Sequence, residues 1–584
     1  MTFPSQGPNQ SAAHLAPRQW LCAFGVSLGT AILIVTPFFR LGNASGHDIA
    51  FHASSWLDVA GQWKQGIVYP RWCEWANNGF GEPRFIFYPP LSWMLGAALG
   101  FVAPWGAVPG VFIVLVQTLG GISMFALARR FLSPAVAMFA AACYAANPYA
   151  LLIVYLRSDF AELLAWALLP RLLLAALELC GVTQNSSRSR SRAAAILAFL
   201  FACLWLSNAP AGVISSYSMA LLFVWAAIRE KSLAPVWRGT CGLALGFGLA
   251  GFYLLPAAYE ERWVNISQAL SSGLAPAQNF LYTTTGDPDH NAFNRIASSV
   301  ALLLLVLTAI AALLARSTSK NRDDGKAAEK LWPAMVLLGL AAAILMIRPS
   351  SILWGLLPEL RFIQFPWRWM GLLAAPYAFF GAAAIAGARV RWIWMSVVIL
   401  AAAGTGAFLV RKAWWDSDDI PVLQDAIASG QGFDGTDEYD PLSDDHTDLP
   451  AKAPPVVILP AKDTQPSLAK AEIRIVRWTA EEKELTATSP RPLQVAIRLL
   501  NYPAWLVEVN GQQVTPESPD GTAQMILPLP AGRNRIKLSL RRTLDRDLGN
   551  LLSGVSALVL LAALWGRPGG RSRPRLADSS DQSS

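Results

Sequence analysis

Apolar residues occur along the chain in blocks of about 16 to 24 with almost no charge inside a block, the length that crosses about 30 Å of hydrocarbon. This pattern predicts a polytopic α-helical membrane protein with about twelve transmembrane helices. The predicted spans are residues 19–39, 108–128, 133–150, 161–180, 193–208, 212–228, 239–257, 296–315, 332–347, 368–387, 392–410 and 548–565.

Residues 88–103 are also apolar, but they begin with prolines 89 and 90 and contain two glycines. If this segment crossed the membrane, the basic clusters after the later spans would all face outward. If it lies in the interface or re-enters, they all face the cytoplasm, as the positive-inside rule requires. We therefore predict an interfacial or re-entrant segment. The prediction gives a multi-pass protein of the cytoplasmic (inner) membrane with both termini in the cytoplasm.

The composition supports a membrane protein, since 54% of the residues are hydrophobic and 15% are charged. Soluble proteins have roughly 25% charged residues, so a soluble globular enzyme is excluded. The net charge of +8 comes from clusters between apolar blocks, where lysine and arginine act as topology signals, and nucleic acid is not a predicted partner. Six cysteines, five of them in or beside apolar segments, offer neither a disulfide framework nor a CxxC metal site.

The remaining segments define further regions. Residues 1–18 and the basic tail 566–584 are predicted to be disordered and cytoplasmic, and residues 40–88 form the first outer loop. Residues 411–470 read as an acidic, Pro-rich outer linker, expected to be a loop. Residues 471–547 alternate like strands, with a predicted hairpin turn at Asn510-Gly511, and indicate a small outer β-sandwich. The last span, 548–565, follows this β-domain.

The first outer loop holds polar residues packed between aromatics, in the runs GHDIAFH and YPRWCEW. Asp48 lies just past the first span, where a carboxylate can bind a divalent cation such as Mg²⁺ or Mn²⁺ or accept a proton from a hydroxyl. His47 and His52 could add nitrogen ligands, while Arg71 and Tyr88 complete the candidate binding residues. In the alternative interpretation Asp48 and His52 only cap or orient an interfacial helix, and the aromatics form a membrane-interface belt.

Two later segments also carry charge at a membrane boundary. The turn YLRSDFAE contains Arg157, Asp159 and Glu162, but a carboxylate in the first turn of a helix is favoured by the helix dipole whatever its function. The segment QFPWRW places Arg368 between two tryptophans. Arginine binds phosphate oxygens bidentately, so a lipid phosphate is one possible ligand, and snorkelling towards head groups is the other interpretation.

These motifs resemble a known family. GHDIAFH, the YPRW…NNGFGEPRFIFYPPL run, RSDFAE and QFPWRW resemble bacterial membrane proteins labelled 6-pyruvoyl-tetrahydropterin synthase-related, over roughly residues 20–410. The general layout is similar to C-type (GT-C) glycosyltransferases, which use polyprenyl-phosphate sugar donors, and the NYPAW…VNG run resembles the outer β-domain of YfhO-like proteins. The pterin chemistry of the label finds no support, because the chain has only five scattered histidines.

The resemblance implies roles for several residues. Asp48 matches the catalytic or metal-associated carboxylate of the first outer loop, Asp159 and Glu162 match the second-loop acidic positions loosely, and Arg368 corresponds to a donor-phosphate contact. C-type enzymes often carry two neighbouring acidic residues in the first loop, whereas here His47 precedes Asp48.

The leading hypothesis is inverting sugar transfer from a polyprenyl-phosphate donor to an envelope acceptor at the outer face of the membrane. A lipid or polysaccharide transporter and a non-catalytic envelope scaffold are the alternatives. Few charges lie within the predicted spans, which favours chemistry at the surface over a pathway through the bilayer.

Overall fold

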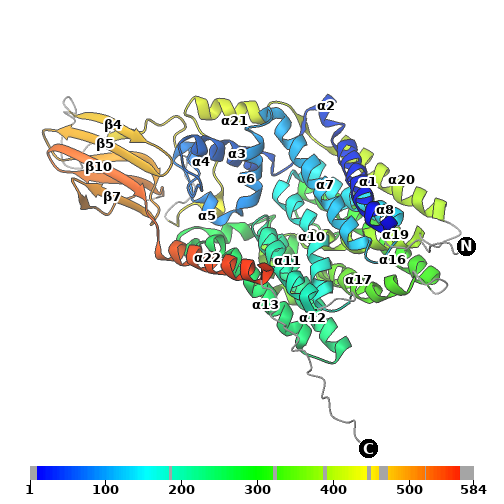
Figure 1. The fold of residues 1–584 in the computed structure, drawn as a ribbon. Helices are drawn as coiled ribbons and strands as arrows, with labels where there is room; N and C mark the ends of the chain where they lie inside the picture. The colour runs from blue at the N-terminus through cyan, green and yellow to red at the C-terminus, as the bar shows by residue number, and fades with distance from the viewer. Residues whose placement is uncertain are drawn as a thin grey trace, which may run out of the picture.

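Long apolar helices account for most of the protein, and a β-domain is attached at one end of them (Figure 1). The computed structural model describes residues 10–182, 187–319, 325–385, 391–442, 449–459, 471–519 and 521–565. The main helices are α1 (Gln10–Val35), α7 (Val108–Ala128), α8 (Pro134–Ala145), α9 (Pro148–Leu152), α10 (Phe160–Leu179), α11 (Ser187–Trp205), α12 (Ala209–Glu230), α13 (Ala234–Leu249), α14 (Gly251–Glu260), α16 (Pro288–Ser319), α17 (Gly325–Leu345), α19 (Met370–Ile385), α20 (Arg391–Lys412) and α22 (Leu544–Trp565).

The prediction of a multi-pass helical membrane protein with a C-terminal β-rich region is confirmed, but the count of twelve spans is not. Among the described residues, 8 helices are long and apolar enough to cross a membrane, or 10 if two sharply bent pairs each form one span. The bent pairs are Ala234–Leu249 with Gly251–Trp263, at 75°, and Leu331–Leu345 with Arg348–Leu356, at 90°. The other two predicted spans are helical too. However, α11 begins with a basic stretch, and α19 is described over 16 residues only.

The apolar segment after the first outer loop forms a short helix, α6 (Pro90–Leu99). Its 10 residues reach only about 15 Å at 1.5 Å per residue, about half of the hydrocarbon thickness. It therefore cannot cross the membrane as a straight helix, in agreement with the interfacial prediction.

Helix α10 is the most deeply buried of the described span helices. It contains Pro170, which has no N–H group to bond the carbonyl of Trp166 one turn earlier. The hydroxyl of Tyr144, on α8, donates to that carbonyl at 2.6 Å instead. A proline is therefore accommodated inside a packed membrane helix because the neighbouring helix supplies the missing donor.

The β-domain has two antiparallel sheets, of strand order β4-β5-β10-β7-β8 and β3-β6-β9. One apolar core contains residues of both sheets, as expected for a sandwich. The predicted hairpin turn is present between β7 and β8, with φ of 53° at Asn510 and 81° at Gly511. The strands are β3 (Val456–Leu459), β4 (Glu472–Trp478), β5 (Glu482–Ser489), β6 (Leu493–Leu500), β7 (Trp505–Val509), β8 (Gln512–Gln513), β9 (Gln524–Leu529) and β10 (Gly532–Leu540).

Buried polar contacts join this domain to the helices. Arg546, in the first turn of α22, binds both carboxylate oxygens of Glu260 at the end of α14, at 2.7 and 2.9 Å. The hydroxyl of Tyr502, before β7, donates to the same carboxylate at 2.7 Å. One carboxylate thus connects two helices and the β-domain.

The outer linker is not the loop that its composition predicted. Strand β2 (Trp415–Asp416) pairs with β1 (Asn43–Ala44) of the first outer loop, and helix α21 (Asp419–Ala428) follows. Acidic residues favour the first turn of a helix, and Ile420 packs against Ala53 and Leu57 of helix α3 (Ile49–Lys64). This packing explains the helix. Parts of the linker, residues 443–448 and 460–470, lie outside the described residues.

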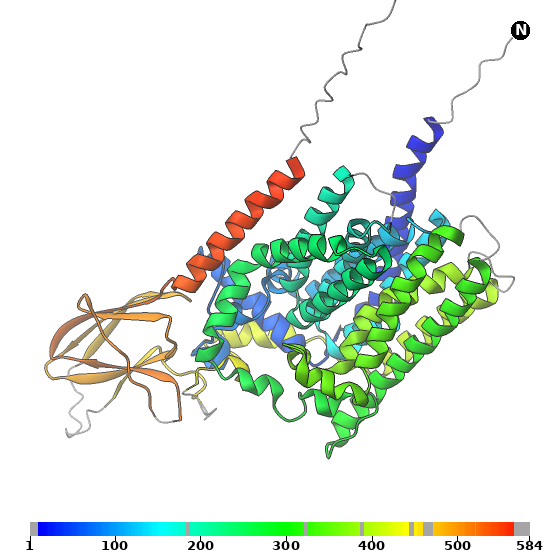
Figure 2. The ribbon, with the colours of Figure 1, turned by 90° about the horizontal axis from the view of Figure 1, so that it is seen from below.

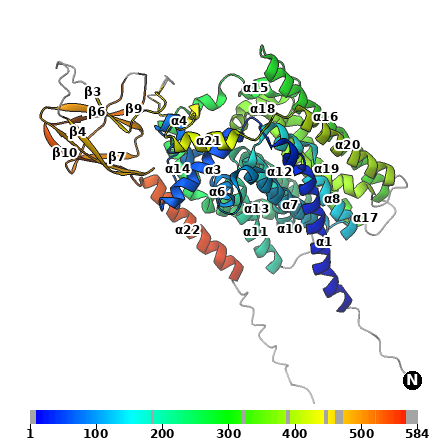
Figure 3. The same ribbon diagram turned by 90° about the horizontal axis from the view of Figure 1, so that it is seen from above.

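The bundle has two distinct ends. The start of α1 and the end of α22 lie on the same side, away from α21 and the β-domain (Figures 2 and 3). Residues 10–18, predicted to be disordered, belong to helix α1. Residues 1–9 and the tail 566–584 lie outside the described residues.

Candidate functional site

The first outer loop and the turn before α10 are held together by their backbones. The N–H of Asp48 donates to the carbonyl of Arg157 at 2.8 Å, where a short π-helical turn (Ile153–Arg157) ends. Ser158 follows in the left-handed conformation, with φ of 55°, and its hydroxyl donates to Ala44 at 2.7 Å. A Cβ at Gly46 would lie 2.5 Å from the carbonyl carbon of Arg157, so this close approach requires glycine.

This contact brings five charged side chains together. The Arg157 guanidinium lies 2.8 Å from Asp48, 3.2 Å from Asp159 and 2.7 Å from Glu162. Arg368, distant in sequence, lies 3.1 Å from Glu162 and 3.4 Å from Asp159. We call these five residues the charge cluster. Three carboxylates and two guanidiniums that sequence analysis found in three separate segments therefore form one network.

Burial differs within the charge cluster. The side chains of Arg157 and Asp159 are each 4% exposed and that of Glu162 is 0% exposed, whereas that of Asp48 is 32% exposed. Burial alone would raise the pKa of Asp159, but the charges of Arg157 and Arg368 hold it well below its ordinary value. Asp159 is therefore ionised at neutral pH. Asp48 is the carboxylate through which the cluster meets solvent.

The carboxylate of Glu162 accepts hydrogen bonds from four side chains. Besides the two arginines, it accepts hydrogen bonds from the Tyr149 hydroxyl and, at 3.0 Å, from the indole N–H of Trp166. Asp159 caps α10, since its carboxylate accepts from the backbone N–H of Glu162 at 2.9 Å. Asp159 therefore both caps the helix and pairs with the two arginines.

Arg368 does not snorkel, because its side chain is 7% exposed and turned into the protein. Its Nε and Nη2 atoms face Glu162 and Asp159. Its Nη1 atom donates to two neutral oxygens, the carbonyl of Ile363 at 3.0 Å and the side chain of Gln364 at 3.2 Å. A negatively charged phosphate oxygen would bind Nη1 more strongly than these neutral acceptors do. Nη1 is therefore the atom of Arg368 that could exchange its present partners for a phosphate.

His52 lies against the cluster without a hydrogen bond. Its Nε2 atom is 3.6 Å from the Asp159 carboxylate, and both ring nitrogens are buried with no partner among the described residues. The ring is surrounded by aromatic side chains, with Tyr88 at 5.9 Å and Phe160 at 5.4 Å between centroids. His52 and Tyr88 thus line the buried side of the cluster.

Aromatic side chains border the exposed side. Phe365 stacks on Trp367 with ring centroids 4.9 Å apart, and the Arg157 guanidinium lies 5.1 Å from the Trp367 ring. The exposed His47 packs against Phe293 at 4.8 Å, and Phe293 contacts Trp367 at 5.9 Å. A band of rings therefore extends beside Asp48.

Arg71 is the one predicted site residue that the structure places elsewhere. Its guanidinium stacks on Tyr69 at 4.7 Å, and its backbone N–H donates to Glu481 of the β-domain at 3.0 Å. It supports the contact between the first outer loop and the β-domain rather than the charge cluster.

The residues from 85 to 414 match the family described as "6-pyruvoyl-tetrahydropterin synthase related domain; membrane protein". The match covers more than half of the chain. The chain belongs to this family. The resemblance inferred from the loop motifs is therefore confirmed for the membrane domain. The matched region contains Asp159, Glu162 and Arg368, whereas Asp48 precedes it.

Solved structures with similar chains include two glycosyltransferases. The oligosaccharyltransferase of Archaeoglobus fulgidus has 13% identity and a TM-score of 0.38, over 71% of this chain and 57% of its own. Arabinofuranosyltransferase AftD from Mycobacteria has 18% identity and a TM-score of 0.38, over 68% of this chain and 27% of its own. This chain thus spans little more than half of the first structure and about a quarter of the second. No curated protein matches it.

A divalent cation at Asp48, one of the two roles considered for this carboxylate, would need further metal ligands beside it. Within the described residues, no group of three or more His, Cys, Asp or Glu side chains is placed to hold a metal ion. Asp48 pairs with Arg157 instead. The residues around it therefore do not fit a Mg²⁺ or Mn²⁺ site.

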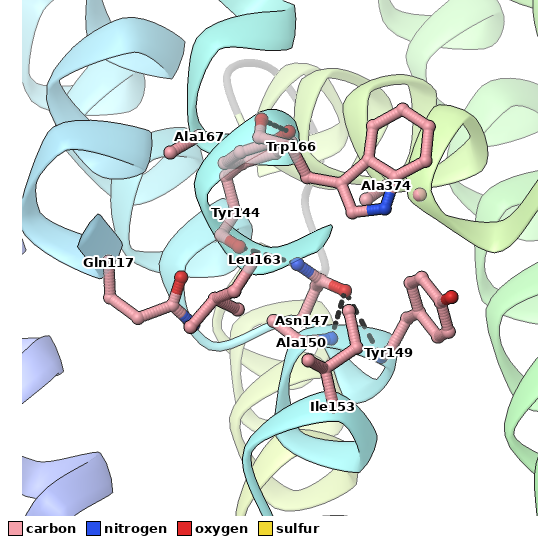
Figure 4. A pocket seen from close by; sticks show the side chains of 11 residues that line it. Gln117, Tyr144, Asn147, Tyr149, Ala150, Ile153, Leu163, Trp166, Ala167 and Ala374 are labelled. Atoms are coloured by element: carbon pink, nitrogen blue, oxygen red, sulfur yellow. Dashed lines mark hydrogen bonds between the residues drawn. The ribbon is translucent and has the colours of Figure 1, made fainter. Parts of the chain in front are cut away.

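Sequence analysis missed the residues behind the cluster. Tyr149 and Trp166, which bind Glu162, also line a cavity of ≈ 10 Å³, about the space of one water molecule (Figure 4). Asn147 shapes this region, because its side chain accepts from the N–H groups of Tyr149 and Ala150. The Asn147-Pro148 pair is a helix-start signal that would have located this break in the predicted span.

Proposed function

We propose that this family member is a membrane glycosyltransferase that transfers a sugar from a polyprenyl-phosphate donor to a hydroxyl-bearing envelope acceptor at the outer face of the cytoplasmic membrane. One observation carries the proposal. Asp48 is a partly exposed carboxylate, held by Arg157, at the edge of an otherwise buried charge cluster. A fixed carboxylate that solvent and substrate can reach is what a general base requires.

The proposed reaction is a direct displacement. Asp48 accepts the proton of the acceptor hydroxyl as that oxygen bonds to the anomeric carbon of the sugar. The bond from the anomeric carbon to the phosphate oxygen breaks, and the polyprenyl phosphate leaves with the electron pair. One displacement on the face opposite the leaving group inverts the anomeric configuration. The proton on Asp48 then passes to water.

The other cluster residues act as positioning residues in this proposal. Arg157 binds one oxygen of Asp48 at 2.8 Å and leaves the other oxygen for the acceptor. Asp159 and Glu162 neutralise the two arginines. Nη1 of Arg368, which bonds only to neutral oxygens, is the donor proposed to exchange them for a donor phosphate oxygen.

The aromatic band supports a sugar as the ligand. Phe365, Phe293 and His47 are each at least partly exposed. Phe365 lies 5.5 Å from the Arg157 guanidinium, His47 precedes Asp48 in the sequence, and Phe293 packs against His47. The apolar face of a sugar ring packs on such rings while its hydroxyls reach neighbouring charges.

The function is tested with the purified full-length protein in proteoliposomes. Undecaprenyl-phosphate-linked hexoses and pentoses with a labelled sugar are supplied as donors, and the labelled product is isolated and its anomeric configuration determined by NMR. We expect loss of label from one donor class and an inverted product. Donor that binds but is never consumed would overturn the proposal in favour of a scaffold, and intact donor appearing on the other leaflet would overturn it in favour of a transporter.

A further inference from the structure

Helix α10 carries an arginine within its membrane-spanning length. Arg171 lies eight residues before the end of the helix at Leu179, which is about 12 Å at 1.5 Å per residue. An ionised side chain within a span is costly and is seldom retained without a partner. The structure therefore has to supply an acceptor for this guanidinium.

The described residues supply few acceptors to this guanidinium. Arg171 is within electrostatic range of one carboxylate among them, Glu178, and of two further arginines, Arg130 and Arg192. That carboxylate is already bonded to Arg130, at 2.9 Å. Within the described part of the chain, three guanidiniums thus share one carboxylate, and the local charge is positive.

One donor in this group is buried without a hydrogen bond. Nη1 of Arg171 has no partner within the described part of the chain. A buried charged donor that is left unpaired destabilises the folded protein. This unpaired donor, beside a carboxylate that Arg130 already engages, indicates an acceptor other than the described residues.

The position of this basic group separates it from the charge cluster. Helix α10 begins beside the cluster at Asp159, and its 20 residues extend about 30 Å. Arg130 follows the end of α7, and Arg192 lies in the second turn of α11, which follows α10 in the chain. The basic group therefore lies towards the opposite end of the bundle, where α1 begins (Figure 2).

We propose that the basic group formed by Arg130, Arg171 and Arg192 binds a phosphate group, either the phosphodiester of an anionic phospholipid or a free phosphate ion. Planar guanidiniums match phosphate oxygens in pairs, and basic pockets between membrane helices bind anionic head groups. This site is independent of the proposed sugar transfer, because it shares no residue with the charge cluster.

The test uses the full chain in detergent, with native mass spectrometry and thermal unfolding as readouts. The probes are phosphatidylglycerol, phosphatidylcholine and inorganic phosphate. Arg171→Gln removes the partly buried guanidinium that carries the unpaired Nη1. Arg229→Gln is the matched control, because Arg229 lies in the last turn of α12. Its guanidinium is already engaged by the Trp225 ring, at 4.9 Å from the centroid, and by Glu230, at 3.7 Å.

We expect phosphatidylglycerol to bind the wild type and to bind Arg171→Gln at least about fivefold more weakly, the effect expected of one basic residue at an anionic head group. Arg229→Gln should bind as the wild type does. Stabilisation by inorganic phosphate alone would identify a free phosphate as the ligand, and stabilisation only by the lipid would identify the head group.

A second variant keeps the test decisive if Arg171→Gln fails to fold. Arg130→Gln changes a side chain that is 52% exposed, and it should weaken binding in the same direction. Equal binding of phosphatidylglycerol and phosphatidylcholine, or undiminished phosphatidylglycerol and phosphate binding in both variants, would overturn the proposal.

Discussion

Replacing Glu162 by glutamine tests whether the charge cluster stabilises the bundle. The amide oxygen can still accept from Tyr149 and Trp166, which bond to one carboxylate oxygen. The amide NH₂ then replaces the other oxygen, which accepts from Arg157 at 2.7 Å and from Arg368 at 3.1 Å. The substitution therefore sets a donor against two buried guanidiniums while the shape of the side chain hardly changes.

The expected cost follows from those two bonds. A hydrogen bond to a charged group contributes about 1.5–3 kcal/mol, and breaking a buried ion pair from one side costs about 3–5 kcal/mol. We therefore expect Glu162→Gln to lower the free energy of unfolding by about 3–5 kcal/mol. Glu484→Gln is the control, because Glu484 pairs with Arg535, which is 71% exposed, and such surface pairs contribute about 1 kcal/mol or less.

The assay is denaturant unfolding of the full-length protein in detergent micelles, followed by the loss of helical circular dichroism. The double variant Glu162→Gln/Arg157→Gln should cost less than the sum of the single variants, because the two side chains form one pair. A loss below about 1 kcal/mol for Glu162→Gln, similar to a surface pair, would refute the reasoning that the buried cluster depends on this carboxylate.

Three further predictions concern other parts of the protein. Burial, and then the charge of Glu74, raise the pKa of Asp58 to about 7. The pKa of an aspartate in the unfolded chain is about 4, so the folded state binds the proton more tightly. The free energy of unfolding should therefore fall as pH rises from about 4 to 7. Asp58→Asn should reduce this pH dependence when unfolding is measured across that range. A cysteine at Ser187 should be shielded from an impermeant thiol reagent in intact cells while one at Ser429 is labelled, and the reverse result would invert the topology. The single ammonium group of a lysine at position 368 cannot contact both carboxylates and the acceptors of Nη1 at once. Arg368→Lys should therefore weaken undecaprenyl-phosphate binding by about tenfold, or about 1.4 kcal/mol, in a lipid-binding titration. Unchanged affinity would remove Arg368 from the donor site.

The hydrophobic pattern predicted most of the helices because long apolar blocks have few alternatives in a membrane. It could not count the spans reliably, because bends such as the one between α13 and α14 depend on packing. Alternation over residues 471–547 predicted the β-domain, and strand β5 shows it directly, since Leu485 and Ala487 are buried between more exposed residues.

The candidate site was predictable in its residue types but not in its pairing. Asp48, Asp159 and Arg368 each stand out as charges at a membrane boundary, yet their contact depends on the close approach of the Gly46 backbone to Arg157. Sequence spacing does not reveal a contact between segments that are far apart in the chain. For the same reason, Arg71 looked equivalent to the other loop residues until the β-domain was placed beside it.

The rate of the transfer step in single turnover tests the central claim most directly. Purified wild type, Asp48→Asn and Asp289→Asn are saturated with the undecaprenyl-phosphate sugar that the donor assay identifies, and sugar transfer is followed over time. Asp289 is an exposed carboxylate in the first turn of α16, so it serves as the matched control. The account predicts that Asp48→Asn binds the donor normally but transfers about 10²–10⁴-fold more slowly, as for the loss of a general base, while Asp289→Asn transfers at the wild-type rate. Transfer by Asp48→Asn at the wild-type rate would contradict the account.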